Sequence, residues 1–117
     1  MRGQYLELRF FDVDPFSPSG LSCDALRLMH CFVLDGLSRV SRPKTNAELS
    51  SILTRADASA LADPLAKTPA EIIPEIGGRL ASLAPLARSL GAEWEASLDS
   101  FSRALTVPRE SASARIA

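Results

Sequence analysis

Histidine, cysteine and aromatic residues are scarce in this sequence. It has one histidine and two cysteines, and aromatic residues make up only 6% of its 117 residues. It also lacks a glycine-rich phosphate loop, a GxSxG turn, an HExxH pair and a CxxC pair. His30 has no second ligand at helical spacing, which favours a core or boundary histidine over a metal ligand or a base. We therefore expect no enzyme, no catalytic residue, no metal and no cofactor.

An excess of charge of one sign is also missing. Thirteen basic and fourteen acidic residues leave a net charge of −1, so nucleic-acid binding would depend on a local basic patch. No apolar stretch is long enough to cross a membrane. The first residues, MRGQYLELRFFDVD, alternate charged and apolar side chains and do not resemble a signal peptide.

The two cysteines indicate a reducing compartment. Cys23 and Cys31 fall on one predicted helix, about 12 Å apart along its axis, which is too far for a disulfide. Buried thiols in a reduced cytosol are the favoured interpretation, with redox sensing or an intermolecular bridge as alternatives. We expect a cytoplasmic protein.

Leucine and alanine dominate the apolar residues, and 117 residues suffice for one domain. We predict an N-terminal extended segment and loop over residues 1–20, a helical domain over 21–106 and a flexible tail over 107–117. The expected fold class is mainly α, with a helix-turn-helix-like domain, a short N-terminal strand and a long C-terminal helix.

The N-terminal strand is predicted from alternation over Tyr5–Val13. Leu6, Leu8 and Phe10 share one side of an extended chain, with charged residues opposite. Its pairing partner would be an edge strand at residues 71–74 or a second copy of the chain.

The first predicted helix runs from about Leu21 to Asp35 and ends at Gly36. It is apolar over most of its circumference, so it belongs at the centre of the fold or at a subunit interface.

Two short helices joined by a polar turn follow. Thr45 and Glu48 have the spacing of a capping box for a helix that begins at Asn46. The buried face of this helix is expected to comprise Ala47, Leu49, Ile52 and Leu53. After a turn at Thr54 and Arg55, a second helix is predicted from Ala56 or Asp57 to Lys67. This arrangement predicts a helix-turn-helix.

The C-terminal half begins with a capping pattern at residues 68–71, soon interrupted by Pro74 and by Gly77 and Gly78. An apolar stripe then predicts one long helix, kinked at Pro85 and weakened at Gly91. Its residues are Leu80, Leu83, Ala87, Leu90, Trp94, Leu98, Phe101 and Leu105. Such a stripe is either intramolecular core or a dimer seam. As a dimer or partner interface it would comprise Leu90, Trp94, Leu98, Phe101 and Leu105.

Two segments together resemble winged-helix transcription regulators of the MarR type. A Leu-Ser start, a later histidine, Arg-Pro-Lys, a Glu-Leu helix and an Arg-x-Asp turn occur in the order of one branch of that family. The matching residues are Leu21, Ser22, His30, Arg42, Pro43, Lys44, Glu48, Leu49, Arg55 and Asp57. The resemblance implies a helix-turn-helix in the major groove, a β-hairpin wing in the minor groove and dimerisation through the terminal helices.

Two functions are therefore expected. The first is a small dimeric DNA-binding transcriptional regulator, in which basic residues contact phosphates and Ser59 approaches base edges. Its phosphate contacts would be Arg39, Arg42, Lys44 and Arg55. The alternative is a helical protein-interaction module without DNA binding, favoured because Asp57, Asp63 and Pro64 fall in the expected recognition helix and no wing follows it. The expected partners are double-stranded DNA, a second copy of the chain or another protein, with no membrane.

Overall fold

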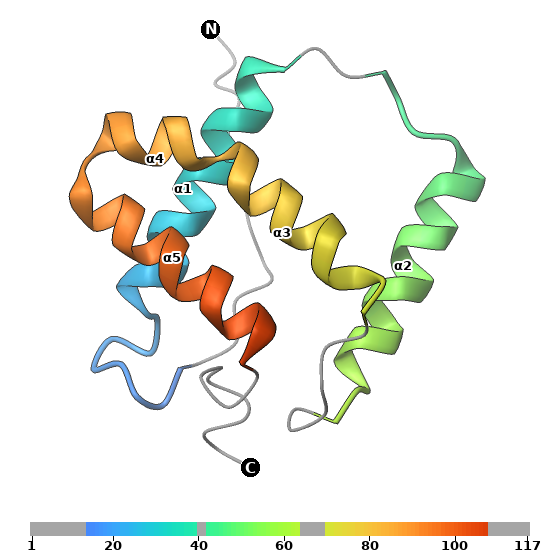
Figure 1. Ribbon diagram of the computed structural model, residues 1–117. Helices are drawn as coiled ribbons and strands as arrows, with labels where there is room; N and C mark the ends of the chain where they lie inside the picture. Colours follow the sequence, from blue (N-terminus) through green and yellow to red (C-terminus); the bar gives the residue numbers. More distant parts are fainter. Residues whose placement is uncertain (1–13, 40–41, 64–69, 108–117) are drawn as a thin grey trace, which may run out of the picture.

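The chain is mainly α-helical. A computed structural model describes residues 14–39, 42–63 and 70–107. These ranges contain no strand, and their helices are α1 (Cys23–Ser38), α2 (Asn46–Ala60), α3 (Ile72–Ser82), α4 (Ala84–Leu90) and α5 (Ala92–Thr106) (Figure 1). The predicted strand over Tyr5–Val13 lies outside the described residues, as does nearly all of the predicted tail.

The starts of α1 and α2 follow local capping rules, whereas α3, α4 and α5 begin without a side-chain cap. The Ser22 hydroxyl accepts the backbone N–H of Ala25 at 3.0 Å, which places the start of α1 at Cys23. At α2, the N–H of Thr45 donates to Glu48 Oε2 at 2.8 Å, and the N–H of Glu48 donates to Thr45 Oγ1 at 3.2 Å. The predicted capping box and the start at Asn46 are confirmed.

The end predicted for the first helix is wrong by a few residues. Instead of stopping at Gly36, α1 continues to Ser38. A Cβ placed on Gly36 would meet nothing within 4 Å, so that glycine serves no close approach. Gly36 remains helical because the residues on both sides of it continue the backbone hydrogen bonds of α1.

The predicted turn at Thr54 and Arg55 is also wrong, because α2 runs through both residues without a break. The Thr54 hydroxyl donates to the Ser50 carbonyl one turn earlier at 3.0 Å, so it is satisfied inside the helix. No glycine or proline interrupts this stretch. The helix ends at Ala60, ahead of Pro64, which disfavours helical geometry in the residue before it.

Three shorter helices replace the single long C-terminal helix that the stripe predicts. Pro85 cannot donate to the carbonyl of Ala81 and its ring would clash there, so α3 stops and α4 begins around Leu83. Gly91 has φ +137°, a conformation that side chains rarely adopt, and it separates α4 from α5. The two expected weak points are therefore complete breaks.

Pro74 and the glycine pair do not interrupt the chain as expected. Pro74 is the third residue of α3, where a missing N–H costs no intrahelical hydrogen bond. Gly77 faces α5, because a Cβ there would lie 3.7 Å from Leu105 Cδ2. Packing against α5 thus supports a helix that local propensity disfavours.

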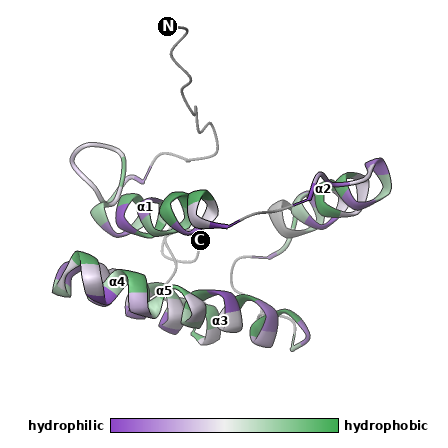
Figure 2. Ribbon diagram, turned by 90° about the horizontal axis from the view of Figure 1, so that it is seen from above, coloured by the Kyte–Doolittle hydropathy of each residue, from purple (hydrophilic) through white to green (hydrophobic). Residues whose placement is uncertain are grey.

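The helices form two layers around a small core. Figure 2 shows α1 lying over a layer made by α3, α4 and α5, with α2 set to one side. α5 packs against α1, α3 and α4. The buried apolar residues are Cys31, Leu80, Leu83, Ala87 and Leu98. Among the described residues, α2 packs against none of the other four helices.

Candidate interaction surface

The basic residues predicted to contact DNA are engaged in ion pairs. Arg39 Nε lies 2.8 Å from Asp35 Oδ2, an i, i+4 pair at the end of α1. Arg55 Nη2 lies 2.7 Å from Glu75 Oε2, which links α2 to α3. A phosphate would have to compete with a carboxylate at both residues.

Arg42 is paired most completely. Its guanidinium binds both carboxylate oxygens of Glu48, with Nη1 at 3.1 Å from Oε2. This hydrogen bond, helped by the Thr45 N–H and by nearby Lys44, lowers the pKa of Glu48 from 4.5 to about 2. The same pairing raises the pKa of Arg42. The Arg-Pro-Lys segment thus anchors the start of α2.

The predicted DNA-contact set is spread over several segments. Arg39 directly follows α1, Arg42 and Lys44 precede α2, Arg55 lies within α2 and Ser59 lies in its last turn. A recognition helix needs a second helix packed across it to fix its angle in the groove. α2 has no such partner helix in the part of the chain that is described.

The predicted interface stripe faces the chain's own interior. Leu98 is buried, and Leu90, Trp94 and Phe101 pack against the core cluster. Leu105 approaches Gly77 of α3. These residues therefore fill the space between α5 and its neighbours, which is the intramolecular alternative for the stripe.

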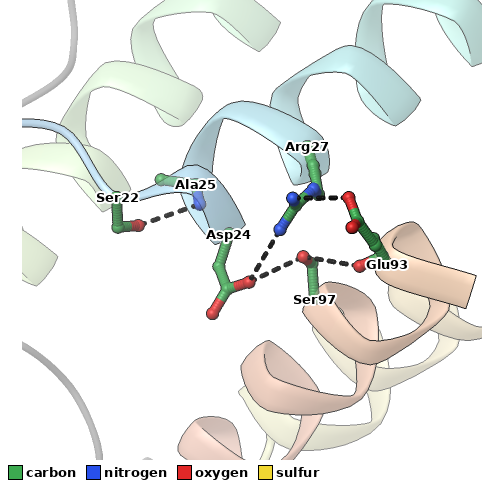
Figure 3. A network of polar contacts seen from close by, with 6 residues as sticks. All are labelled: Ser22, Asp24, Ala25, Arg27, Glu93 and Ser97. Atoms are coloured by element: carbon green, nitrogen blue, oxygen red, sulfur yellow. Dashed lines mark hydrogen bonds and ion pairs between the residues drawn. The ribbon is translucent and has the colours of Figure 1, made fainter.

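A polar network ties α1 to α5 (Figure 3). The Ser97 hydroxyl donates toward Asp24 Oδ1 at 2.7 Å and lies 2.9 Å from the Glu93 carbonyl oxygen. Arg27 Nη2 lies 2.7 Å from Glu93 Oε2, and its Nη1 lies 3.8 Å from Asp24 Oδ1. Ser97 is buried, so this network fixes how the two helices pack.

Beside this network, His30 contacts Trp94 edge to face. Trp94 Nε1 donates to His30 Nδ1 at 3.3 Å, and the Arg27 guanidinium lies 5.7 Å from the Trp94 ring centre. Within residues 14–39, 42–63 and 70–107, no cluster of His, Cys, Asp and Glu side chains could hold a metal ion. His30 is an exposed residue whose ring accepts a hydrogen bond from Trp94, so the predicted core or boundary position is wrong.

The cysteines are both free thiols. Cys31 is buried in the core, and burial raises its pKa, whereas Cys23 is exposed at the start of α1. The interpretation of buried thiols therefore holds for Cys31 alone. A raised pKa keeps the Cys31 thiol protonated and unreactive.

An exposed apolar face on α2 is the feature that sequence reasoning assigned to the interior. Leu49, Ile52 and Leu53 are 46%, 50% and 64% exposed. They recur at i, i+3 and i+4, so they share one side of the helix. We call these three residues the α2 face. The spacing itself was visible in the sequence, but nothing local shows whether such a face is covered.

None of the described helices is long and apolar enough to cross a membrane. Comparisons of this chain with protein-family models, with curated proteins and with solved structures found no match. The α2 face is an apolar surface that no other described helix covers.

Proposed function

We propose that the chain is a helical protein-interaction module that docks through the α2 face. The observation that carries the proposal is the exposure of Leu49, Ile52 and Leu53 on a helix that packs against no other described helix. An amphipathic helix with anchors at this spacing fits a groove or another helix on a partner.

The length of α2 supports a docking role. A 15-residue helix is marginal in water when tertiary packing does not support it. The capping box holds its start and the Arg55–Glu75 ion pair ties its second half to α3, but both lie on exposed surface and contribute little. Burial of three large apolar side chains by a partner supplies the missing stabilisation.

Charge favours a protein partner over a duplex. The guanidinium groups of Arg39, Arg42 and Arg55 are already paired with carboxylates on the same chain. To bind DNA, these guanidinium groups would have to leave their carboxylates for phosphates. The free energy gained by releasing counterions from the DNA would then be partly offset by the loss of the ion pairs.

Photocrosslinking tests the proposal. We would place a benzophenone amino acid at Leu53, and at Ser51 on the polar side of the same helix as the matched control. We expect adducts to another protein from position 53 only. The partner captured from position 53, once purified without the crosslink, should bind the wild-type chain at least about tenfold more tightly than it binds the Ile52→Glu variant.

Two results would overturn it. One is crosslinking only within the chain, which would show that α2 is covered by its own bundle. The other is retardation of duplex DNA at low salt that Arg42→Ala and Lys44→Ala abolish, which would favour the regulator.

A further inference from the structure

We infer that the partner of the α2 face is a second copy of this chain, bound as an antiparallel α2 pair about a twofold axis between Ile52 and Leu53. The inference rests on the proposed function and names the partner for the same surface. It differs from a dimer through the C-terminal stripe, because that stripe is occupied by the chain's own core.

The shape of the α2 face suits another helix. Leu49, Ile52 and Leu53 continue at Ala56, so the apolar positions follow the i, i+3, i+4, i+7 pattern of a helix–helix seam. This seam is one side chain or two wide. A broad apolar surface on a partner would leave the polar flanks of α2 buried, whereas a second helix would cover the seam alone.

A twofold axis at this position matches apolar residues with apolar residues. In an antiparallel pair, Ile52 lies opposite the partner's Leu53, and Leu49 lies opposite the partner's Ala56. Large residues thus meet at the centre, and a large residue meets a small one at each end. The same patch serves both copies, as an isologous interface requires.

The charges on α2 are self-complementary in the same arrangement. Glu48 and Arg55 are seven residues apart and flank the seam on one side. Antiparallel pairing brings like flanks together, so the Arg42–Glu48 pair of one copy lies beside the partner's Arg55–Glu75 pair, and symmetry repeats this arrangement of alternating charges. Asp57 lies on the other flank, near the partner's helix start and Lys44, where a negative charge is favourable.

A parallel pair lacks these advantages. It would place the two helix starts together, with Arg42 and Lys44 of both copies at one end, and would align the two helix dipoles. Repulsion at that end disfavours the parallel arrangement. The antiparallel pair is the one that both the seam and the charges favour.

The size of the seam predicts a weak dimer. A 15-residue helix is about 22 Å long, and a few side chains from it bury much less than the roughly 800 Å² per partner of a standard interface. Association should therefore depend on concentration, with monomers at low micromolar concentration and dimers accumulating well above it.

Sedimentation velocity of the full chain, from about 10 µM to about 1 mM, is the first test. We expect wild type to shift from monomer to dimer, Ile52→Glu to stay monomeric and Ser51→Glu, on the polar side, to behave as wild type. Arg55→Gln should weaken the dimer about three- to tenfold, because it removes the positive charge beside the partner's Glu48 at two symmetric positions. Glu75→Gln, which removes the carboxylate that binds Arg55 within the chain, should not weaken it.

Disulfide trapping tests the orientation. In a Cys23→Ser background, the Leu49→Cys chain mixed with the Ala56→Cys chain should form a mixed disulfide under mild oxidation. Either chain alone should crosslink far less, because antiparallel pairing separates identical positions by about 10 Å along the axis. Efficient linkage between two Leu49→Cys chains would overturn the antiparallel arrangement.

The outcomes separate this inference from the proposed function. A wild type that stays monomeric near 1 mM overturns the second copy as partner, while crosslinking from position 53 to a different protein still supports docking by α2. A dimer that survives Ile52→Glu overturns the placement of the interface. Circular dichroism matching wild type will show that each variant is folded.

Discussion

Ser97 is the residue at which α1 and α5 are joined by a buried polar contact. Its hydroxyl is the donor to Asp24 and is shielded from water between the two helices. The Asp24 side chain is 48% exposed, so water can replace part of this hydrogen bond when the donor is removed, whereas the space left by the buried Ser97 hydroxyl stays closed to water. The contact spans 73 residues of sequence, so no local pattern could have predicted it.

We predict that Ser97→Ala lowers the free energy of unfolding by about 1 kcal/mol, because Asp24 loses a hydrogen bond and a small void remains. Urea denaturation followed by circular dichroism measures the change. Ser89→Ala is the control, since the Ser89 hydroxyl donates to Leu86 on exposed surface, where water can replace it. Equal losses for the two variants would contradict the importance of burial at Ser97.

Glu48 makes the start of α2 sensitive to acid. Its pKa is lowered from 4.5 to about 2, chiefly by the hydrogen bond from Arg42. A lowered pKa in the folded chain means that the stabilisation is present above pH 4.5 and is lost as pH falls through about 2. The amide resonances of Thr45 and Glu48 should therefore titrate with a midpoint near pH 2 in NMR spectra of the folded chain, and Glu48→Gln should remove that titration. A midpoint near the ordinary glutamate value would show that the Arg42 pair does not persist in solution.

Among the elements, the capping box of α2 was predictable because it involves residues three positions apart, whereas the pattern at residues 68–71 did not mark the start of α3, which begins at Ile72 without a side-chain cap. The Thr45–Glu48 box follows from sequence alone. The positions of the breaks between α3, α4 and α5 were predictable from the sequence. Whether each position would be a kink or a complete break was not. Pro85 and Gly91 mark weak points by their chemistry, whereas packing decides whether a weak point bends a helix or ends it.

Gly91 should be difficult to replace. Its φ of +137° lies in a region that is essentially restricted to glycine. We predict that Gly91→Ala costs roughly 1–3 kcal/mol of unfolding free energy through backbone strain. Its Cβ would lie at an ordinary contact distance, 3.7 Å, from the Trp94 ring, so steric overlap adds nothing.

Gly36→Ala is the matched control for that strain. Gly36 lies within α1, and the space that an alanine methyl group would occupy there is open, so alanine should stabilise the helix by about 0.5–1 kcal/mol. Thermal unfolding of both variants should therefore shift in opposite directions. If Gly36→Ala lowered the free energy of unfolding as much as Gly91→Ala, the break between α4 and α5 would not require positive φ at Gly91.

At the scale of the whole molecule, the helices should differ in how readily they open. α5 packs against three other helices, whereas α2 packs against none of those described. We predict that α2 amides exchange with deuterium much faster than α5 amides at low micromolar protein concentration, because opening α2 breaks no core contact. Hydrogen-exchange mass spectrometry resolves the two segments.

Concentration provides the control for that measurement. Protection of α2 should increase at high protein concentration in wild type, where dimers form, and not in Ile52→Glu. Slow exchange of α2 in the monomer would contradict its independence from the bundle.

The helical class, the start of α2 and the apolar stripe were predictable from the amino-acid sequence, because they depend on side-chain chemistry and spacing along one helix. Which apolar faces are covered depends on how the helices pack. The stripe around Leu98 is enclosed by α1, α3 and α4, whereas the α2 face has the same spacing and no described helix over it. Periodicity indicates that a helix face is apolar, but the burial of that face depends on residues far away in the chain. The pairing of Arg55 with Glu75 likewise depends on how α2 and α3 are placed in the fold.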